Sequence, residues 1–203
     1  MPMKPKVKTV PERGVGEIAK HAYSLDIDAI NVILPSRAAT ESFGRSIGRL
    51  LQGGEVLALM GSLGAGKTAL VRGIATGLRV PSDAVSSPTF VLAHEYRGRL
   101  PLIHIDLYRV SDGLEADASG LSDSFTDRTV VAIEWADRFP AWLPSDRLEF
   151  RLSHRTPFTR GLTITALGPV SSLLFQRVKH VQQRMRSGRT RAKSLIRRKA
   201  SRQ

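Results

Sequence analysis

Apolar and polar residues form blocks along the chain that predict strands separated by helices. The segment 55–60 is almost continuously apolar, which is typical of a strand buried on both faces of a sheet. Shorter segments of the same kind predict further strands, at 30–34, 90–96, 102–107, 129–134, 148–152 and 162–166. Because helical patterns lie between buried strands, we expect an α/β fold whose sheet is at least partly parallel.

Two helices are predicted, one before and one after the strand at 55–60. The first begins near Ser36, and its apolar residues recur at helical spacing: Ala39, Phe43, Ile47 and Leu50 or Leu51. Gly44 and Gly48 lie inside this pattern and weaken a helix by about 1 kcal/mol each relative to alanine. The second helix is predicted at 67–78. Residues 111–128 are polar and indicate a connection that contains one short helix.

A phosphate-binding motif connects the strand at 55–60 to the second helix. The sequence there reads Gly61-Ser62-Leu63-Gly64-Ala65-Gly66-Lys67-Thr68 and fits the pattern G-x-x-x-x-G-K-[ST]. The glycines let backbone N–H groups wrap around phosphate oxygens, and the helix N-terminus adds partial positive charge. Lys67 supplies a cation for the β- and γ-phosphates, and the Thr68 hydroxyl a ligand for Mg²⁺. We therefore predict that this loop binds a nucleotide together with Mg²⁺.

A phosphate loop works with an acidic residue at the end of another buried strand. Glu134 follows four apolar residues at 130–133, and Asp106 follows the segment 102–105. A carboxylate in this place holds Mg²⁺ or orients the attacking water. The competing interpretation is a surface acid that ends a strand. The sequence also leaves open which of the two is the main Mg²⁺ contact.

Composition excludes several classes of protein. The chain has 203 residues and no cysteine, which excludes disulfides, cysteine-ligated metals and thiol catalysis. The apolar segments are far shorter than the roughly 20 residues that a membrane span needs. No apolar segment follows the basic N-terminus, as a secretory signal would require. We expect a cytoplasmic protein without a membrane span. The spacing of the five histidines predicts no zinc site.

Further motifs give the sequence a resemblance to a known family. After the phosphate loop come Ser-Pro-Thr-Phe at 87–90, His-Glu-Tyr at 94–96, His-Ile-Asp-Leu-Tyr-Arg at 104–109 and Ala-Ile-Glu-Trp at 132–135. In this order the set resembles the TsaE (YjeE) family, the bacterial P-loop ATPases of tRNA threonylcarbamoyladenosine synthesis. The resemblance covers about 30–168. It implies an α/β, P-loop NTPase-like three-layer fold with a mixed, partly parallel central sheet.

The resemblance also implies an activity and partners. A member of this family is a Mg²⁺-dependent ATPase that acts beside TsaB and TsaD. TsaD transfers the threonylcarbamoyl group to an adenosine next to the anticodon of tRNA. The ATPase is an accessory component, so its contact with tRNA is indirect or runs through a separate segment. Two alternatives remain from the residues alone: a small-molecule kinase with the same phosphate loop, and a basic RNA-binding module with a vestigial nucleotide site.

Site residues carry over from the family position by position. The loop 61–68 would hold the triphosphate, with Thr68 and Glu134 as Mg²⁺ contacts and Asp106 facing the same site. Lys67, Glu134 and Asp106 are the expected catalytic residues. Thr89 would lie in a switch-like loop near the γ-phosphate, and Thr40 near the nucleotide base.

The sequence departs from the family at two places. Ser62 stands where the family usually has aspartate, which removes a charge but leaves the backbone of the loop. Leu114 replaces one of a pair of glutamates, which removes an acidic group from that surface. Trp135 fits either a stacking or partner contact or a structural role, and Tyr108 and Arg109 fit either a docking surface or a structural pair.

The positive charge of the chain lies at its C-terminal end. The net charge is +13, and residues 176–203 hold eleven basic residues and no acidic one. Apolar residues at helical spacing, from Val170 to Met185, predict an amphipathic helix at 169–187. We expect a weakly ordered extension at 1–28, the ATPase domain at 29–168, and a basic disordered tail at 188–203. The tail either solubilises the protein, contacts tRNA phosphates or meets an anionic membrane surface.

Overall fold

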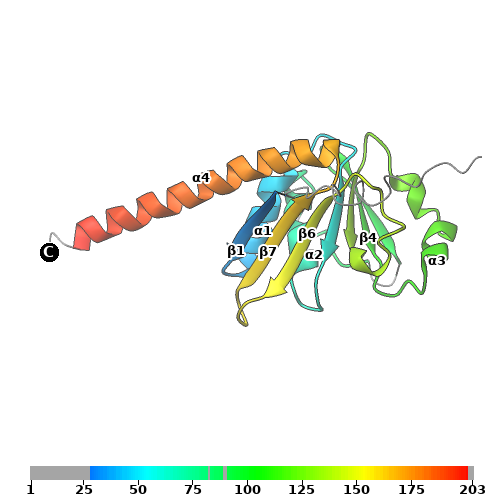
Figure 1. The fold of residues 1–203 in the computed structure, drawn as a ribbon, viewed down its shortest axis with the longest axis horizontal. Coiled ribbons are helices and arrows are strands. Elements are labelled where there is room, and N and C mark those ends of the chain that lie inside the picture. Colours follow the sequence, from blue (N-terminus) through cyan, green and yellow to red (C-terminus); the bar gives the residue numbers. More distant parts are fainter. Residues whose placement is uncertain (1–27, 82, 89–90, 201–203) are drawn as a thin grey trace, which may run out of the picture.

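A seven-stranded sheet forms the centre of the molecule (Figure 1). The computed structural model describes residues 28–81, 83–88 and 91–200. The strands lie in the order β1-β7-β6-β2-β5-β4-β3. Their bounds are β1 Ala29–Leu34, β2 Val56–Met60, β3 Ala93–Arg97, β4 Pro101–Asp106, β5 Val130–Glu134, β6 Leu148–His154 and β7 Arg160–Ala166.

The sheet is mixed, as predicted. The neighbours β6, β2, β5 and β4 are parallel to one another, whereas β1, β7 and β3 run antiparallel to their neighbours. All residues of β2 and β5 are buried, which confirms the interpretation of their continuous apolar sequences. The strand predicted at 90–96 corresponds to β3, which begins later than predicted, at Ala93. Residues 89–90 lie outside the described part.

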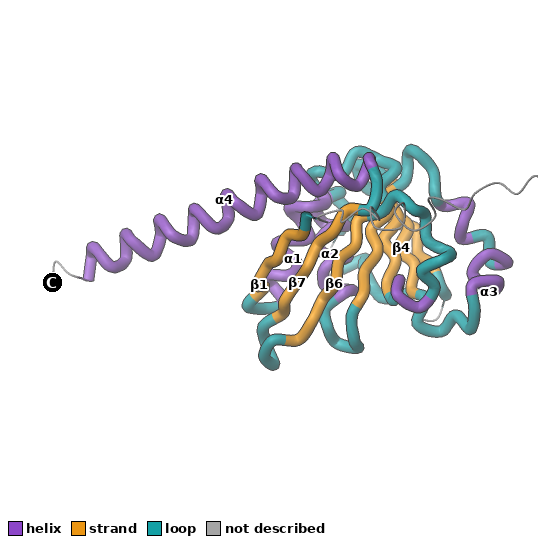
Figure 2. The backbone as a smooth tube through the Cα atoms, in the orientation of Figure 1, coloured by secondary structure: helices purple, strands orange, loops and turns teal. Residues whose placement is uncertain are grey.

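Helices cover both faces of the sheet unequally (Figure 2). On one face, α1 (Arg37–Gly48) and α2 (Lys67–Gly77) share a core with Leu57, Phe150 and their neighbours. On the other face lie the short helices α3 (Gly113–Ala118), η2 (Leu121–Ser124) and η3 (Ala136–Arg138). The predicted start of α1 is confirmed, since the Ser36 side chain accepts a hydrogen bond from the Ala39 N–H at 3.1 Å.

Four glycines allow α1 and α2 to pack with their backbones almost in contact. A Cβ at Gly44, Gly48, Gly73 or Gly77 would collide with backbone atoms of the opposite helix. Gly44 and Gly48 weaken α1 as an isolated helix, but without them the two helix backbones could not approach so closely. The approach matters for the site, because α2 begins at the phosphate loop and α1 carries Thr40 beside it.

A long helix, α4 (Pro169–Ala200), follows β7 directly. Asp146 caps its first turn by accepting hydrogen bonds from the N–H groups of Val170 at 2.7 Å and Ser171 at 2.9 Å. Partial burial, the largest single effect, acts to raise the pKa of Asp146, but the hydrogen bonds from Ser171 and Val170 together outweigh it and lower the pKa. Within the described ranges, no helix combines the length and apolar character of a membrane span.

The predicted end of this helix at Ser187 is wrong, and so is the disordered tail expected from 188 onward, as far as the described residues reach, to Ala200. The helix continues through Gly188 to Ala200. One glycine costs only about 1 kcal/mol, and the arginines, lysines and alanines that follow it are favourable helix formers. Residues 1–27 and 201–203 lie outside the described part of the chain, and so does the extension expected at 1–28, apart from Asp28.

Replacing Gly77 with alanine should destabilise the protein, although alanine is the better helix former. The new Cβ would meet the Arg45 carbonyl oxygen and the Gly48 Cα, so α1 and α2 must separate. We expect the free energy of unfolding in urea to fall by about 1–3 kcal/mol. Gly113→Ala is the matched control, since nothing lies within 4 Å of a Cβ there. Equal stability of the two variants would show that the helices tolerate a wider separation.

Candidate nucleotide site

The phosphate loop lies at the carboxyl end of β2 and leads into α2. Three of its glycines adopt positive φ: 138° at Gly61, 73° at Gly64 and 105° at Gly66. Side chains strain such a backbone, and a Cβ at Gly61 would also collide with the Leu152 carbonyl oxygen. The motif therefore forms the curved backbone that phosphate binding requires.

Lys67 lies inside this loop and is largely buried. Its Nζ donates hydrogen bonds to the carbonyl oxygens of Gly61 at 2.7 Å and Ser62 at 3.1 Å. The same atom lies 3.5 Å from the centre of the Trp135 ring, which attracts the cation. Burial lowers the pKa of Lys67 from its ordinary value of 10.5, while the neighbouring carboxylates, Glu134 first, oppose the shift.

Glu134 connects the phosphate loop to the neighbouring strand. Its Oε2 accepts a hydrogen bond from the Thr68 hydroxyl at 3.1 Å, and its Oε1 lies 2.9 Å from His104 Nε2. Because a carboxylate only accepts, the hydrogen of His104 is on Nε2. Nδ1 of His104 is buried and has no hydrogen-bond partner in the part of the chain that the structure describes. The contact with His104 restrains the orientation of Glu134.

Asp106 lies beside Glu134, its partner in the register of the parallel strands β4 and β5. Its carboxylate accepts hydrogen bonds from the Ser87 hydroxyl at 2.8 Å and from the Tyr108 N–H at 2.9 Å. Ser87 belongs to the segment expected to form a switch-like loop. Thr89, the nucleotide contact expected in the same loop, lies outside the described residues.

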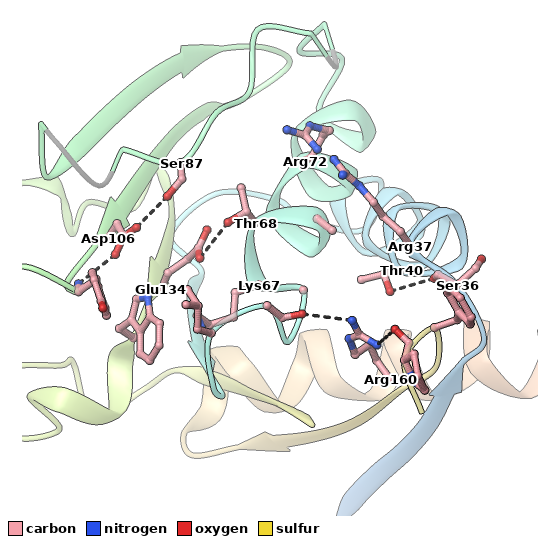
Figure 3. Close-up of a pocket in the computed structure, with 18 residues that line it drawn as sticks. Ser36, Arg37, Thr40, Lys67, Thr68, Arg72, Ser87, Asp106, Glu134 and Arg160 are labelled. Atoms are coloured by element: carbon pink, nitrogen blue, oxygen red, sulfur yellow. Dashed lines mark hydrogen bonds between the residues drawn. The ribbon is translucent and has the colours of Figure 1, made fainter. Parts of the chain in front are cut away.

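These side chains border one pocket of about 510 Å³ (Figure 3). The predicted residues that line it are Thr40, Leu63, Gly64, Gly66, Lys67, Thr68, Asp106 and Glu134. Gly61 and Ser62 contribute the carbonyls that hold Lys67, and Ala65 is fully buried in the core beneath the loop. The Thr40 hydroxyl donates to the Ser36 carbonyl oxygen at 3.2 Å.

Sequence reasoning missed one side of the pocket. It is formed by three arginines, with neighbours from α1 and from the β6–β7 hairpin: Arg37, Arg72, Arg160, Ser36, Pro157 and Phe158. Arg160 donates to the Gly64 carbonyl oxygen at 3.3 Å and so attaches the hairpin to the phosphate loop. No local motif marks the hairpin residues, because the parallel pairing of β6 with β2 is what brings the hairpin beside the phosphate loop.

The oxygen atoms of the site suit a magnesium ion better than a metal that is held by protein side chains alone. Within the described residues, no group of three or more His, Asp or Glu side chains is arranged to hold a metal. Mg²⁺ prefers oxygen ligands and usually takes only one or two carboxylates, completing its shell with phosphates and water. The hydroxyl of Thr68 and the carboxylates of Glu134 and Asp106 suit that pattern.

Comparison with known proteins agrees with this geometry. The family model described as "Threonylcarbamoyl adenosine biosynthesis protein TsaE" matches residues 34–162. The relative of that name from Bacillus subtilis is 38% identical over 130 residues, or 64% of this chain and 80% of its own. The one from Streptomyces coelicolor is 42% identical over 133 residues, or 62% of this chain and 88% of its own.

A solved structure gives the same result. The crystal structure of Bacillus subtilis YdiB has a TM-score of 0.63 and 28% identity, and the match covers 75% of this chain and 95% of that one. Since the family model spans more than half of the chain and the relatives match over most of their own lengths, this chain belongs to the TsaE family.

Proposed function

We propose that this protein binds and hydrolyses ATP with Mg²⁺ as an accessory component of tRNA threonylcarbamoyladenosine biosynthesis. The observation that supports this best is the contact between the phosphate loop and a buried carboxylate, Thr68 to Glu134. It puts a magnesium ligand of the loop and an acidic strand end within one hydrogen bond of each other. The relatives are named as biosynthesis proteins of this modified nucleoside, which supports the biological setting.

The residues of the site divide the work of binding between backbone and side chains. The backbone N–H groups of 61–68 and the start of α2 would hold the phosphates. The Lys67 ammonium, now on two loop carbonyls, would transfer its hydrogen bonds to the β- and γ-phosphates. Thr68, Glu134 and Asp106 would hold Mg²⁺, which neutralises phosphate charge when bound.

The two carboxylates are well placed for distinct roles in hydrolysis. Glu134 is restrained from both sides, by Thr68 and by His104, so its carboxylate is oriented before nucleotide arrives. Asp106 is restrained by Ser87, from the loop expected near the γ-phosphate. We propose that Glu134 is the main Mg²⁺ contact and that Asp106 orients the water or its metal-bound shell.

The proposed partners are proteins like TsaB and TsaD, and hydrolysis is expected to be slow without them. The test is reconstitution of tRNA modification by a TsaB–TsaD pair, with and without this protein and ATP. We expect more modified nucleoside per transferase when both are present. A phosphorylated small-molecule acceptor formed from ATP would instead show that the protein is a kinase.

Replacing Lys67 with alanine should remove most nucleotide affinity. The variant loses the side-chain cation of the loop, and a hydrogen bond to a charged group contributes about 1.5–3 kcal/mol. We expect the dissociation constant for ATP, measured by calorimetry with Mg²⁺, to rise about 10- to 100-fold. Arg97→Ala, at an exposed cation on β3, is the control and should bind normally. Normal ATP binding by a folded Lys67→Ala protein would contradict the assignment of 61–68 as a phosphate-binding loop.

Replacing Glu134 with glutamine should keep nucleotide binding and lose hydrolysis. The amide keeps the shape of the side chain but removes the charge that holds Mg²⁺ or polarises water. Losses of this kind are about a hundredfold or more in turnover. The comparison is Asp106→Asn, with phosphate release and ATP affinity measured for both. If Glu134→Gln hydrolyses ATP normally while Asp106→Asn does not, the proposed roles are reversed.

A further inference from the structure

The distal half of α4, residues 184–200, extends away from the body of the protein. At 1.5 Å per residue, the 32 residues of the helix extend about 48 Å. Figures 1 and 2 show its second half continuing past β1, with no other element beside it. The family model ends at residue 162, so the whole helix lies outside the matched segment. Its role is therefore not explained by the nucleotide site.

The proximal half of α4 is firmly attached. Leu174, Phe175 and Val178 are buried in the core that α1 and α2 share with the sheet. Lys179 forms an ion pair with Asp28 at 2.6 Å, and the Gln182 side chain donates to the Asn31 carbonyl oxygen at 3.4 Å. The distal half is thus presented in a fixed direction from a rigid base.

The charge of α4 is of one sign. Its sequence contains no aspartate or glutamate, and from residue 184 to 200 eight of its residues are basic: Arg184, Arg186, Arg189, Arg191, Lys193, Arg197, Arg198 and Lys199. Like charges three or four residues apart destabilise a helix, and the sequence of α4 contains no acidic residue that would compensate them. A solubilising surface usually mixes both signs. This concentration of charge favours an external polyanion.

The sequence of the distal half also narrows the class of polyanion. It has no aromatic residue, so base stacking and an aromatic membrane anchor are both absent from it. Its apolar residues are few: Met185, Ala192, Leu195, Ile196 and Ala200. Pairing with a second copy would bring two helices of the same charge together. Contact with the phosphates of a nucleic acid meets none of these objections.

We propose that residues 184–200 form a rigid basic arm that binds the phosphate backbone of RNA without reading its sequence. The choice of RNA over DNA rests on the proposed function in tRNA modification, whereas the phosphate contact rests on charge and geometry alone.

The arm and the nucleotide pocket lie at opposite ends of the parallel strands. Leu57, near the start of β2, pairs with Leu148, which pairs with Ala166 just before α4. The phosphate loop follows the other end of β2, at Gly61. Changes in the arm can therefore be made without touching the site, and failure of the arm proposal can be distinguished from failure of the ATPase proposal.

The test compares two full-length variants with equal loss of charge. In the arm variant, Arg189, Arg191, Lys193 and Arg197 become glutamine, which preserves helix propensity. In the control variant, glutamine replaces four exposed arginines of the body: Arg45, Arg49, Arg97 and Arg128. The affinity of each for an in vitro transcribed tRNA is measured across a salt series, together with ATP hydrolysis and helix content by circular dichroism.

We expect the arm variant alone to lose RNA affinity, by about tenfold or more at low salt. Its log–log salt slope should flatten by up to about 3, since each phosphate contact contributes about 0.7–0.9. ATP hydrolysis should stay unchanged in both variants. Equal affinity and slope for the two variants would overturn the proposal. So would selective loss of binding to vesicles of phosphatidylserine and phosphatidylcholine, or tighter binding of duplex DNA with the same number of phosphates.

Discussion

The parallel pairing of β2, β5 and β4 is the constraint on which the site depends. Parallel strands present their carboxyl ends at one edge of the sheet, and here these ends carry the phosphate loop, Glu134 and Asp106. The register places Asp106 directly beside Glu134. Residues separated by more than sixty positions in the chain are thereby brought within hydrogen-bonding distance, as the bond from Thr68 to Glu134 shows.

Burial makes the contacts between these charges consequential. Lys67, Glu134 and Asp106 are each less than 5% exposed, and a charge removed from water is costly unless it is paired or hydrogen-bonded. The loop carbonyls and the Trp135 ring interact with the ammonium of Lys67. Thr68, His104 and Ser87 form hydrogen bonds with the buried carboxylates of Glu134 and Asp106. The lowered pKa of Lys67 records the cost that remains. A triphosphate with Mg²⁺ would supply charges of both signs to the same place.

The molecule separates its candidate nucleotide site from its surplus positive charge. The glycine-lined contact of α1 with α2 holds the phosphate loop and Thr40 together on one side of the sheet. Asp146 caps the start of α4, at the end of the strands away from the phosphate loop. The buried residues of α4 direct its basic half away from the body. A helix with so many like charges would change the electrostatic potential of the pocket if it lay beside it.

The sequence by itself determined the features that depend on neighbouring residues. Continuous apolar segments predicted β2 and β5, the loop motif predicted the strand–loop–helix unit, and strand-ending acids predicted Glu134 and Asp106. The motif series also identified the family. The predictions of the two strands, of the strand–loop–helix unit and of the family are confirmed, because burial and turn geometry impose residue types at short, regular spacing.

Only the tertiary structure decided the features that depend on distant segments. From the sequence alone, Gly44 and Gly48 are residues that weaken a helix. The structure shows that the backbone of α2 occupies the space beside them. Arg160 and Phe158 gave no local signal, because the parallel pairing of β6 with β2 is what carries their hairpin to the pocket. Contacts of this kind are set by register and packing between elements, which no pattern within a single segment encodes.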